Sequence, residues 1–263
     1  MKCPNNLTVV RHGESAYNAL REQKRRSPEY AAFLEAYEAR HDDPGRAQTL
    51  ARQVMRLGSL TLGVGDHDTG LTARGHRQSV ATGKHLPRLI EIPDVIFVSP
   101  YDRTHGTHAG MVEGWPELAK VPVVEDERLR EQEHGLGLLY NDWKLFATLH
   151  PDQEALKALE GKYWYRFPQG ENVPDVRERG RSWLGAVARD YSGQNVLAVA
   201  HHITILSLRA NLERLGVQEY IRLDAEERPI NCGATIYDGD PDLGRDGRLV
   251  LRQYNECLYD LST

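Results

Sequence analysis

The run Leu7-Thr8-Val9-Val10 leads directly into Arg11-His12-Gly13. Apolar and β-branched residues followed by a glycine predict a short strand that ends at a charged pair. Similar runs predict three more buried strands: Asp94–Val98 before Ser99-Pro100, Pro122–Val124, and Asn195–Ala200 before His201-His202. Two closing strands are expected at Ala234–Tyr237 and Arg248–Leu251, joined through a Gly/Asp-rich turn.

Helix-period apolar residues separate these strands. They predict helices at Thr72–Leu89, Asp102–Val112, Asp175–Arg189 and Thr204–Leu215. Continuous apolar strands that alternate with helices are typical of an α/β sheet covered on both faces. We therefore expect a three-layer sandwich with a mostly parallel central sheet flanked by helices, as a single domain over residues 1–263.

Residues 19–66 do not fit this alternation. Apolar residues recur at helical spacing from Tyr30 to Tyr37 and again from Ala47 to Leu57, with a break near Asp43-Pro44-Gly45. We expect a helical insertion here, which would bury its apolar faces over the sheet, as a lid on a site, or against a second copy in a homodimer.

Composition limits the classes of function. The chain has 263 residues and a formal net charge of -5, which argues against nonspecific binding to nucleic acid. No apolar run approaches the ~20 residues of a membrane span, and the start of the chain does not have the pattern of a signal peptide. Three scattered cysteines have neither metal-site nor redox spacing. We expect a cytoplasmic protein without nucleic-acid or membrane partners.

Arginine and histidine residues lie at the ends of several predicted strands. Ligands of open α/β sheets bind beyond the carboxyl ends of the strands. Arg11, His12 and His201 lie at these predicted strand ends, and Arg103 lies at the start of the helix that follows Ser99-Pro100. Arginine matches phosphate oxygens, and imidazole serves as a nucleophile or a base. The pattern predicts a small anion site that contains a nucleophile.

Six segments carry distinctive residues along the chain. They are Arg11-His12-Gly13-Glu14-Ser15 with Asn18, Asp68–Gln78, Ser99–Thr104 with Thr107, Leu129–Gly135, Gly170-Glu171-Asn172 with Asp175 and Arg179, and Val199-Ala200-His201 with Ile205. In their residues and their order they resemble the motifs of the histidine phosphatase, or phosphoglycerate mutase-like, superfamily. The resemblance covers nearly the whole chain and implies that family's fold.

The resemblance also implies roles for single residues. His12 would take the phosphoryl group as phosphohistidine, and Glu131 would protonate the leaving oxygen and then help to activate water. Arg11, Arg103 and His201 would hold the phosphate oxygens, with Asn18 as a further donor. Because these side chains supply the positive charge, no metal or cofactor is expected. Glu133 is the nearest rival for the acid role, and motif register favours Glu131.

Two departures from the family pattern bear on specificity. His202 stands where the family usually has glycine, and it either points away from the pocket or adds a donor at its rim. Basic residues that include Arg21 and Arg25 follow the nucleophile segment. They form either a solvated helix face or a second anion-binding patch.

Three activities remain open from the sequence. A phosphomonoester hydrolase acting on a small phosphorylated metabolite is favoured. A phosphoglycerate mutase would use the same His12, but the chain lacks the "F-T-G-W" and "E-R-H-Y-G" patterns of cofactor-dependent mutases. An inactive phosphate-binding module is disfavoured because the nucleophile, the phosphate ligands and the acid are all present. His105 and His108 share a helix face, but no third ligand completes a metal site.

Overall fold

The computed structural model describes residues 3–57 and 63–260, which form two compact units. Unit 1 comprises residues 3–15, 67–132 and 173–260, and unit 2 comprises residues 16–57, 63–66 and 133–172. Each unit has its own hydrophobic core, so we describe them separately.

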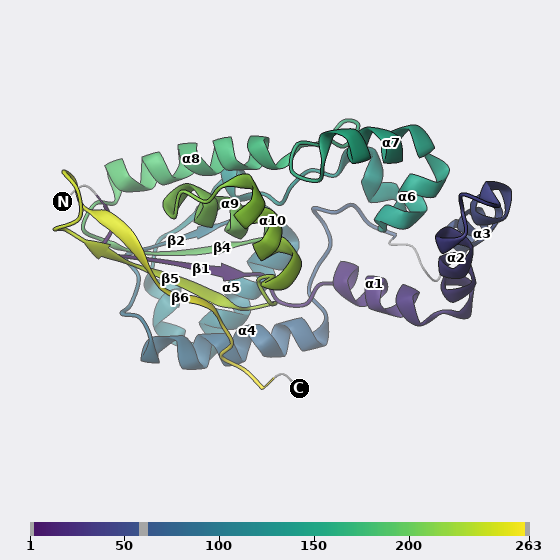
Figure 1. Ribbon diagram of the computed structural model, residues 1–263. Coiled ribbons are helices and arrows are strands. Elements are labelled where there is room, and N and C mark those ends of the chain that lie inside the picture. Colours follow the sequence, from purple (N-terminus) through teal and green to yellow (C-terminus); the bar gives the residue numbers. More distant parts are fainter. Residues whose placement is uncertain (1–2, 58–62, 261–263) are drawn as a thin grey trace. The chain divides into compact units, whose positions relative to one another are not determined.

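Unit 1 is built on one sheet of six strands in the order β3-β2-β4-β1-β5-β6 (Figure 1). The strands are β1 (Asn6–Arg11), β2 (Val95–Val98), β3 (Val123–Glu125), β4 (Asn195–Ala200), β5 (Ala234–Asp240) and β6 (Arg248–Glu256). The first four in that order are parallel, and β5 and β6 are antiparallel to their neighbours. The expected mostly parallel α/β sheet is therefore confirmed.

Helices cover both faces of this sheet. The helices of unit 1 are α4 (Ala73–His85), α5 (Asp102–Gly114), α8 (Val173–Asp190), α9 (His202–Leu212) and α10 (Val217–Glu226). Short 3-10 helices lie at Leu86–Arg88, Pro116–Lys120 and Glu127–Leu129. Figure 1 shows α8 and α9 on one face and α4 and α5 on the other.

Alternation along β4 explains the two layers. Val196, Ala198 and Ala200 pack in the cluster that contains Trp183 of α8, whereas Leu197 and Val199 pack in the cluster that contains Met111 of α5. Successive side chains of a strand point to opposite faces, so an unbroken apolar strand builds two cores at once.

Unit 2 consists of helices. They are α1 (Ala16–Arg26), α2 (Pro28–Glu38), α3 (Pro44–Arg56), a 3-10 helix at Gly135–Tyr140, α6 (Trp143–Leu149) and α7 (Pro151–Glu160). Ser27 and Asp43 cap α2 and α3 by accepting backbone N–H groups of Tyr30 and Arg46. The apolar faces of α2 and α3 pack on each other and on Leu145 of α6. The sequence pattern predicted α2 and α3 but not α1, α6 or α7.

In the part of the chain that the structure describes, no helix combines the length and the apolar character needed to cross a membrane.

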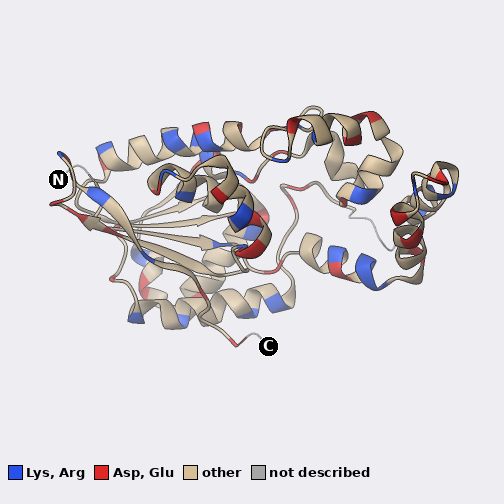
Figure 2. Cartoon of the chain, viewed as in Figure 1, with Lys and Arg blue, Asp and Glu red and all other residues tan. Residues whose placement is uncertain are grey.

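Charge is distributed along the helices. Figure 2 shows basic residues along α4, and basic and acidic residues intermingled along α8.

Candidate active site

The carboxyl ends of β1 and β4 place two histidines side by side. Arg11 pairs with Ala200 in the parallel ladder, and the His12 N–H donates to the Ala200 carbonyl over 3.0 Å. Because His201 follows Ala200, the rings of His12 and His201 meet with their centroids 5.2 Å apart. Strand register alone therefore brings together two residues that lie far apart in the sequence.

His12 is buried and its ring orientation is fixed. Nδ1 lies 2.7 Å from the Gly13 carbonyl, which can only accept, so Nδ1 carries the proton and Nε2 the lone pair. Burial holds the pKa of His12 well below its ordinary 6.5, and the nearby charges of Arg11 and Arg103 lower it further. His202 adds a smaller effect in the same direction. The ring is neutral at neutral pH and presents an unprotonated nitrogen.

Arg11 and Arg103 place positive charge around that nitrogen. Arg11 donates from Nη1 to the Pro229 carbonyl over 2.8 Å, and its buried Nε has no hydrogen-bond partner among the described residues. Burial lowers the pKa of Arg11, whereas the carboxylate of Glu131 opposes that shift. Arg103, only 4% exposed, lies with Cζ 4.3 Å from the ring centroid of Tyr101. A guanidinium stays charged even when buried, so the site attracts anions.

His201 is fully buried, and only one of its ring nitrogens makes a hydrogen bond with the described residues. Nε2 lies 2.8 Å from the Ser99 hydroxyl, and Nδ1 makes no hydrogen bond within the described chain. Burial, with the charges of Arg103 and His12, holds the pKa of His201 well below 6.5. When Ser99 donates to Nε2, the neutral ring carries its proton on Nδ1 and can donate to an anion.

Glu131 is fixed by backbone groups. Its Oε1 accepts the N–H groups of Gln132, over 3.0 Å, and Ile203 of α9, over 3.1 Å. Arg179 of α8 holds the same loop, donating to the carbonyls of Arg128, Arg130 and Glu131 over 2.7–3.0 Å. Oε2 has no donor within the described residues, so it is the oxygen available to a ligand.

Glu133, the rival acid, belongs to the other unit. Its backbone N–H donates to the Glu171 carboxylate over 3.0 Å, and both residues lie in unit 2. Gly170 packs tightly there, since a Cβ would lie 2.4 Å from the Glu133 carbonyl oxygen. Gly170 and Glu171 therefore shape this loop.

Two glycines allow the loop after β1 to pass close to α4. A Cβ on Gly13 would lie 2.5 Å from the Gly75 carbonyl oxygen, and one on Gly75 would lie 2.0 Å from the Glu14 carbonyl oxygen. The Glu14 carboxylate accepts from Thr72 and Arg74. Glu14 therefore fixes the loop that contains His12 to the start of α4.

Hydrogen bonds from the segment 229–259 support the loop that contains His12. Asn231 donates from Nδ2 to the His12 carbonyl over 2.9 Å. The Tyr259 hydroxyl donates to the Asn231 carbonyl, and the Cys232 N–H donates to the Arg11 carbonyl. No sequence pattern marks these contacts, because they depend on how the last strands return to β1.

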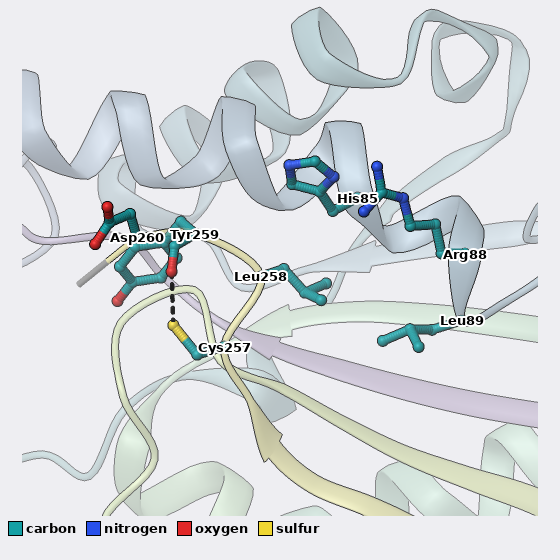
Figure 3. A pocket seen from close by; sticks show the side chains of 7 residues that line it. All are labelled: His85, Arg88, Leu89, Cys257, Leu258, Tyr259 and Asp260. Carbon is teal, nitrogen blue, oxygen red and sulfur yellow. Dashed lines mark hydrogen bonds between the residues drawn. The ribbon is translucent and has the colours of Figure 1, made fainter. Parts of the chain in front are cut away.

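A hollow of about 320 Å³ lies beside this segment in unit 1 (Figure 3). His85, Arg88 and Leu89 line one side, and residues 257–260 line the other, where the Cys257 thiol donates to the Tyr259 carbonyl. None of the predicted site residues lines this hollow. We therefore take the buried cluster around His12 as the candidate active site.

The remaining sequence candidates have the following positions. His202 begins α9, and its Nε2 lies 2.9 Å from Oδ1 of Asp224 on α10. Asn18, Arg21 and Arg25 lie on α1 in unit 2, so the geometry of unit 1 does not include them and their roles stay predictions. On the same helix, Lys24 is buried and donates to the Tyr140 carbonyl.

The described residues contain no group of three or more His, Cys, Asp or Glu side chains arranged to hold a metal ion. His105, which shares a helix face with His108, lies with Nε2 2.9 Å from Oε2 of Glu125. Both side chains are exposed, so this contact lies on the surface.

Known proteins resemble this chain over most of its length. Residues 59–245 match the model of the histidine phosphatase superfamily (branch 1). "Phosphoglycerate mutase-like protein AT74H" of Arabidopsis thaliana is 27% identical over 194 residues, which cover 65% of this chain and 66% of that protein. "Phosphoserine phosphatase 1" of Hydrogenobacter thermophilus is 27% identical over 152 residues, which cover 57% and 66%. The chain thus spans just under two thirds of the length of these two relatives.

A solved structure extends the likeness to the fold. Mycobacterial glucosyl-3-phosphoglycerate phosphatase, in complex with inorganic phosphate, aligns over 97% of this chain and 98% of its own. The TM-score is 0.59 and the identity 22%, so this likeness bears on the fold alone. Because the family model matches well over half of the residues, and the motif residues meet at one end of the sheet, this chain belongs to the histidine phosphatase superfamily, branch 1.

Proposed function

We propose that this protein hydrolyses phosphomonoesters of small metabolites through a phosphohistidine on His12. The observation that carries the proposal is the state of that ring, which is buried and neutral, with Nδ1 bound to the Gly13 carbonyl. Nε2 is therefore a nucleophile held next to two guanidinium groups. Phosphoryl transfer needs mainly such positioning and charge neutralisation.

The proposed reaction has two steps. In the first, Nε2 of His12 bonds to phosphorus, the ester P–O bond breaks, and Glu131 gives its proton to the departing oxygen. In the second, water bonds to phosphorus and gives a proton to Glu131, and the P–N bond breaks to restore neutral His12. Arg11, Arg103 and His201 hold the phosphoryl oxygens throughout, and Asn18 is proposed as a further donor.

Glu131 suits the acid role by its geometry. Two backbone N–H groups bind Oε1, which leaves Oε2 as the oxygen that would carry the proton in the proposed first step. A carboxylic acid in this position protonates an alkoxide that would otherwise leave slowly.

The helical insertion is proposed to choose the substrate. Unit 2 contains Asn18, Arg21 and Arg25, and its helices have a core of their own. A separately packed set of helices can vary in sequence without disturbing the sheet that carries His12. Its action as a lid or as a dimer contact is part of this proposal, as is the treatment of residues 1–263 as one catalytic domain.

The function is tested by replacing the nucleophile. His12→Ala is expected to lower kcat/KM for p-nitrophenyl phosphate by at least about a thousandfold, because the covalent route is lost. The matched control is His105→Ala, an exposed histidine on α5 that is expected to keep full activity. Wild-type enzyme quenched during turnover of ³²P-labelled substrate should carry acid-labile, base-stable phosphate that His12→Ala lacks.

Two results would contradict the proposal. Retained hydrolysis by His12→Ala would exclude a phosphohistidine at this residue. Interconversion of phosphoglycerates at a rate well above hydrolysis would assign the mutase reaction instead, with the same intermediate.

A further inference from the structure

Asn255 lies at a β-bulge in β6, outside the six motif segments of the sequence. In the ladder between β5 and β6, Thr235 alone lies opposite the two residues Tyr254 and Asn255. The backbone of Asn255 has φ 58°, in the left-handed region that asparagine adopts more readily than most residues with a side chain. A bulge re-aims a side chain, and here it turns the Asn255 amide towards the loop between α10 and β5.

This amide holds the backbone on both sides of Pro229. Its Oδ1 accepts the N–H of Ile230 over 2.7 Å, and its Nδ2 donates to the carbonyl of Arg228 over 2.9 Å. Gly233 leaves room for the amide, because a Cβ there would lie 2.4 Å from Oδ1 of Asn255. Proline has no N–H and a restricted φ, so little conformational freedom remains at Pro229.

The peptide unit between Pro229 and Ile230 connects Asn255 to Arg11. A peptide unit is planar, with its N–H and its C=O pointing in opposite directions. The N–H of this unit is bound by Asn255, and its C=O accepts from Nη1 of Arg11 over 2.8 Å. Consecutive hydrogen bonds of this kind polarise and strengthen one another. Asn255 therefore sets the direction of the carbonyl that receives the guanidinium.

Fixing Nη1 of Arg11 fixes the whole guanidinium. The group is planar and carries its five N–H donors in a rigid fork, so one held donor sets the directions of the others. Nε of Arg11 is buried and makes no hydrogen bond with the described residues. A buried donor without an acceptor is costly, and an oxygen of a bound phosphate would satisfy it.

We infer that Asn255 is a positioning residue for Arg11 and acts through the peptide unit between Pro229 and Ile230. The inference rests on the part of the proposed function that makes Arg11 a ligand of the phosphate. It goes beyond that function, because it makes phosphate binding depend on a side chain at the far end of β6. Loss of the Asn255 amide should therefore weaken the binding of phosphate.

The test measures the Kd of inorganic phosphate by isothermal titration calorimetry, which does not depend on turnover. Asn255→Gly removes the amide and keeps a residue that adopts the left-handed conformation without strain. It is expected to raise the Kd about tenfold, the cost of losing the alignment of one charged hydrogen-bond donor. The matched control is Arg214→Gly, which replaces an exposed residue of unit 1 with φ 59° and should leave the Kd as it is.

A double-mutant cycle separates positioning of Arg11 from general support of the fold. Arg11→Lys keeps the positive charge, but its ammonium is a point charge that needs no fixed plane. Arg11→Lys should itself weaken phosphate binding, and adding Asn255→Gly to it should raise the Kd by less than about twofold.

Three results would overturn the inference. They are an unchanged Kd in Asn255→Gly, an equal loss with Arg11 present and in the Arg11→Lys background, and wild-type affinity in Arg11→Lys. None of them bears on the phosphohistidine, which His12→Ala and the labelling experiment test independently.

Discussion

At the scale of single residues, the site depends on where protons sit. His12 and His201 would each titrate near neutral pH in water, and burial beside arginines keeps both neutral. The sequence predicted that these two histidines, Arg11 and Arg103 would meet, because all four follow strand ends of one sheet. It could not predict the contacts of Asp224 with His202 or of Tyr259 with Asn231, because no sequence motif marks these long-range contacts.

Buried neutral histidines make stability depend on pH. The folded pKa values of His12 and His201 lie well below 6.5, so below pH 6.5 the unfolded chain binds protons that the folded chain does not. The free energy of unfolding should therefore fall as pH falls from 6.5, by about 1.4 kcal/mol per pH unit for each histidine. Urea unfolding at pH 7.5, 6.5 and 5.5 measures this slope.

The variant that carries both His12→Gln and His201→Gln should have a flatter slope below pH 6.5, and His105→Gln should keep the wild-type slope. An unchanged slope in the double variant would show that other groups cause the loss of stability.

Arg179 holds the backbone of Glu131, the proposed acid, and is expected to affect the proposed reaction through it. Arg179→Met removes the donors to the Arg128, Arg130 and Glu131 carbonyls, so Glu131 should lose its fixed position. We expect kcat for ethyl phosphate to fall ten- to a hundredfold, and kcat for p-nitrophenyl phosphate to fall much less, because nitrophenolate leaves without a proton. Arg181→Met, on the same helix but exposed and paired with Glu178, is the control. Equal losses on both substrates would contradict a role through the acid.

At the scale of elements, the close approach of α4 to the end of β1 determines the shape of the loop that contains His12. The Gly13 N–H donates to the Thr107 hydroxyl of α5, and the Glu14 N–H donates to Gln78 of α4. Both helices of one sheet face therefore hold the loop that contains His12. The glycine at position 75 is required by the space available rather than by backbone conformation.

Gly75→Ala should disturb this approach. The new methyl group would meet the Glu14 carbonyl oxygen at 2.0 Å, so α4 or the loop must shift, at a cost of about 1–3 kcal/mol in the free energy of unfolding. Activity should fall as well, because His12 is only two residues from Glu14. Gly185→Ala in α8 is the matched control, since nothing lies within 4 Å of its Cβ. It should stabilise the protein by about 0.5–1 kcal/mol. Thermal unfolding and p-nitrophenyl phosphate turnover check both variants.

The elements that the sequence predicted best were the strands and the helices with a clear apolar period. The helix expected to reach Leu89 ends at His85 and continues as a 3-10 turn, because Pro87 cannot donate to the helical ladder. The helix α10 and the helices α6 and α7 were missed. In α7 no residue is buried, so it carries little of the periodic signal by which helices are recognised.

At the scale of the whole molecule, the net charge describes the chain as one sum, whereas packing divides it into two units. The net charge of -5 is a sum over the chain and does not reveal the guanidinium groups gathered around His12. Packing instead divides the described residues into two units, with Phe97 in the core of unit 1 and Phe33 in the core of unit 2. The sequence predicted extra helices after Asn18. It did not predict that residues 133–172 would pack with them, because these two segments of unit 2 lie far apart in the sequence.

Core substitutions should act on one unit at a time. Phe33→Ala is expected to cost about 3–5 kcal/mol in unit 2, and Phe97→Ala a similar amount in unit 1, because both side chains are buried. Hydrogen exchange followed by mass spectrometry should show faster exchange in residues 16–57 and 133–172 for Phe33→Ala. For Phe97→Ala, the change should appear in the strands of the sheet. Uniformly faster exchange in both variants would mean that the two units unfold together.

The position of β1 in the sheet has a consequence for synthesis. β1 pairs with β4 on one side and β5 on the other, and both partners come late in the chain. During translation β1, which directly precedes His12, therefore has no partner strand until most of the polypeptide has been made. Nascent chains that stop before Asn195 should form helices but should not bring His12 and His201 together, so the proposed hydrolysis is expected only after β4 has been made.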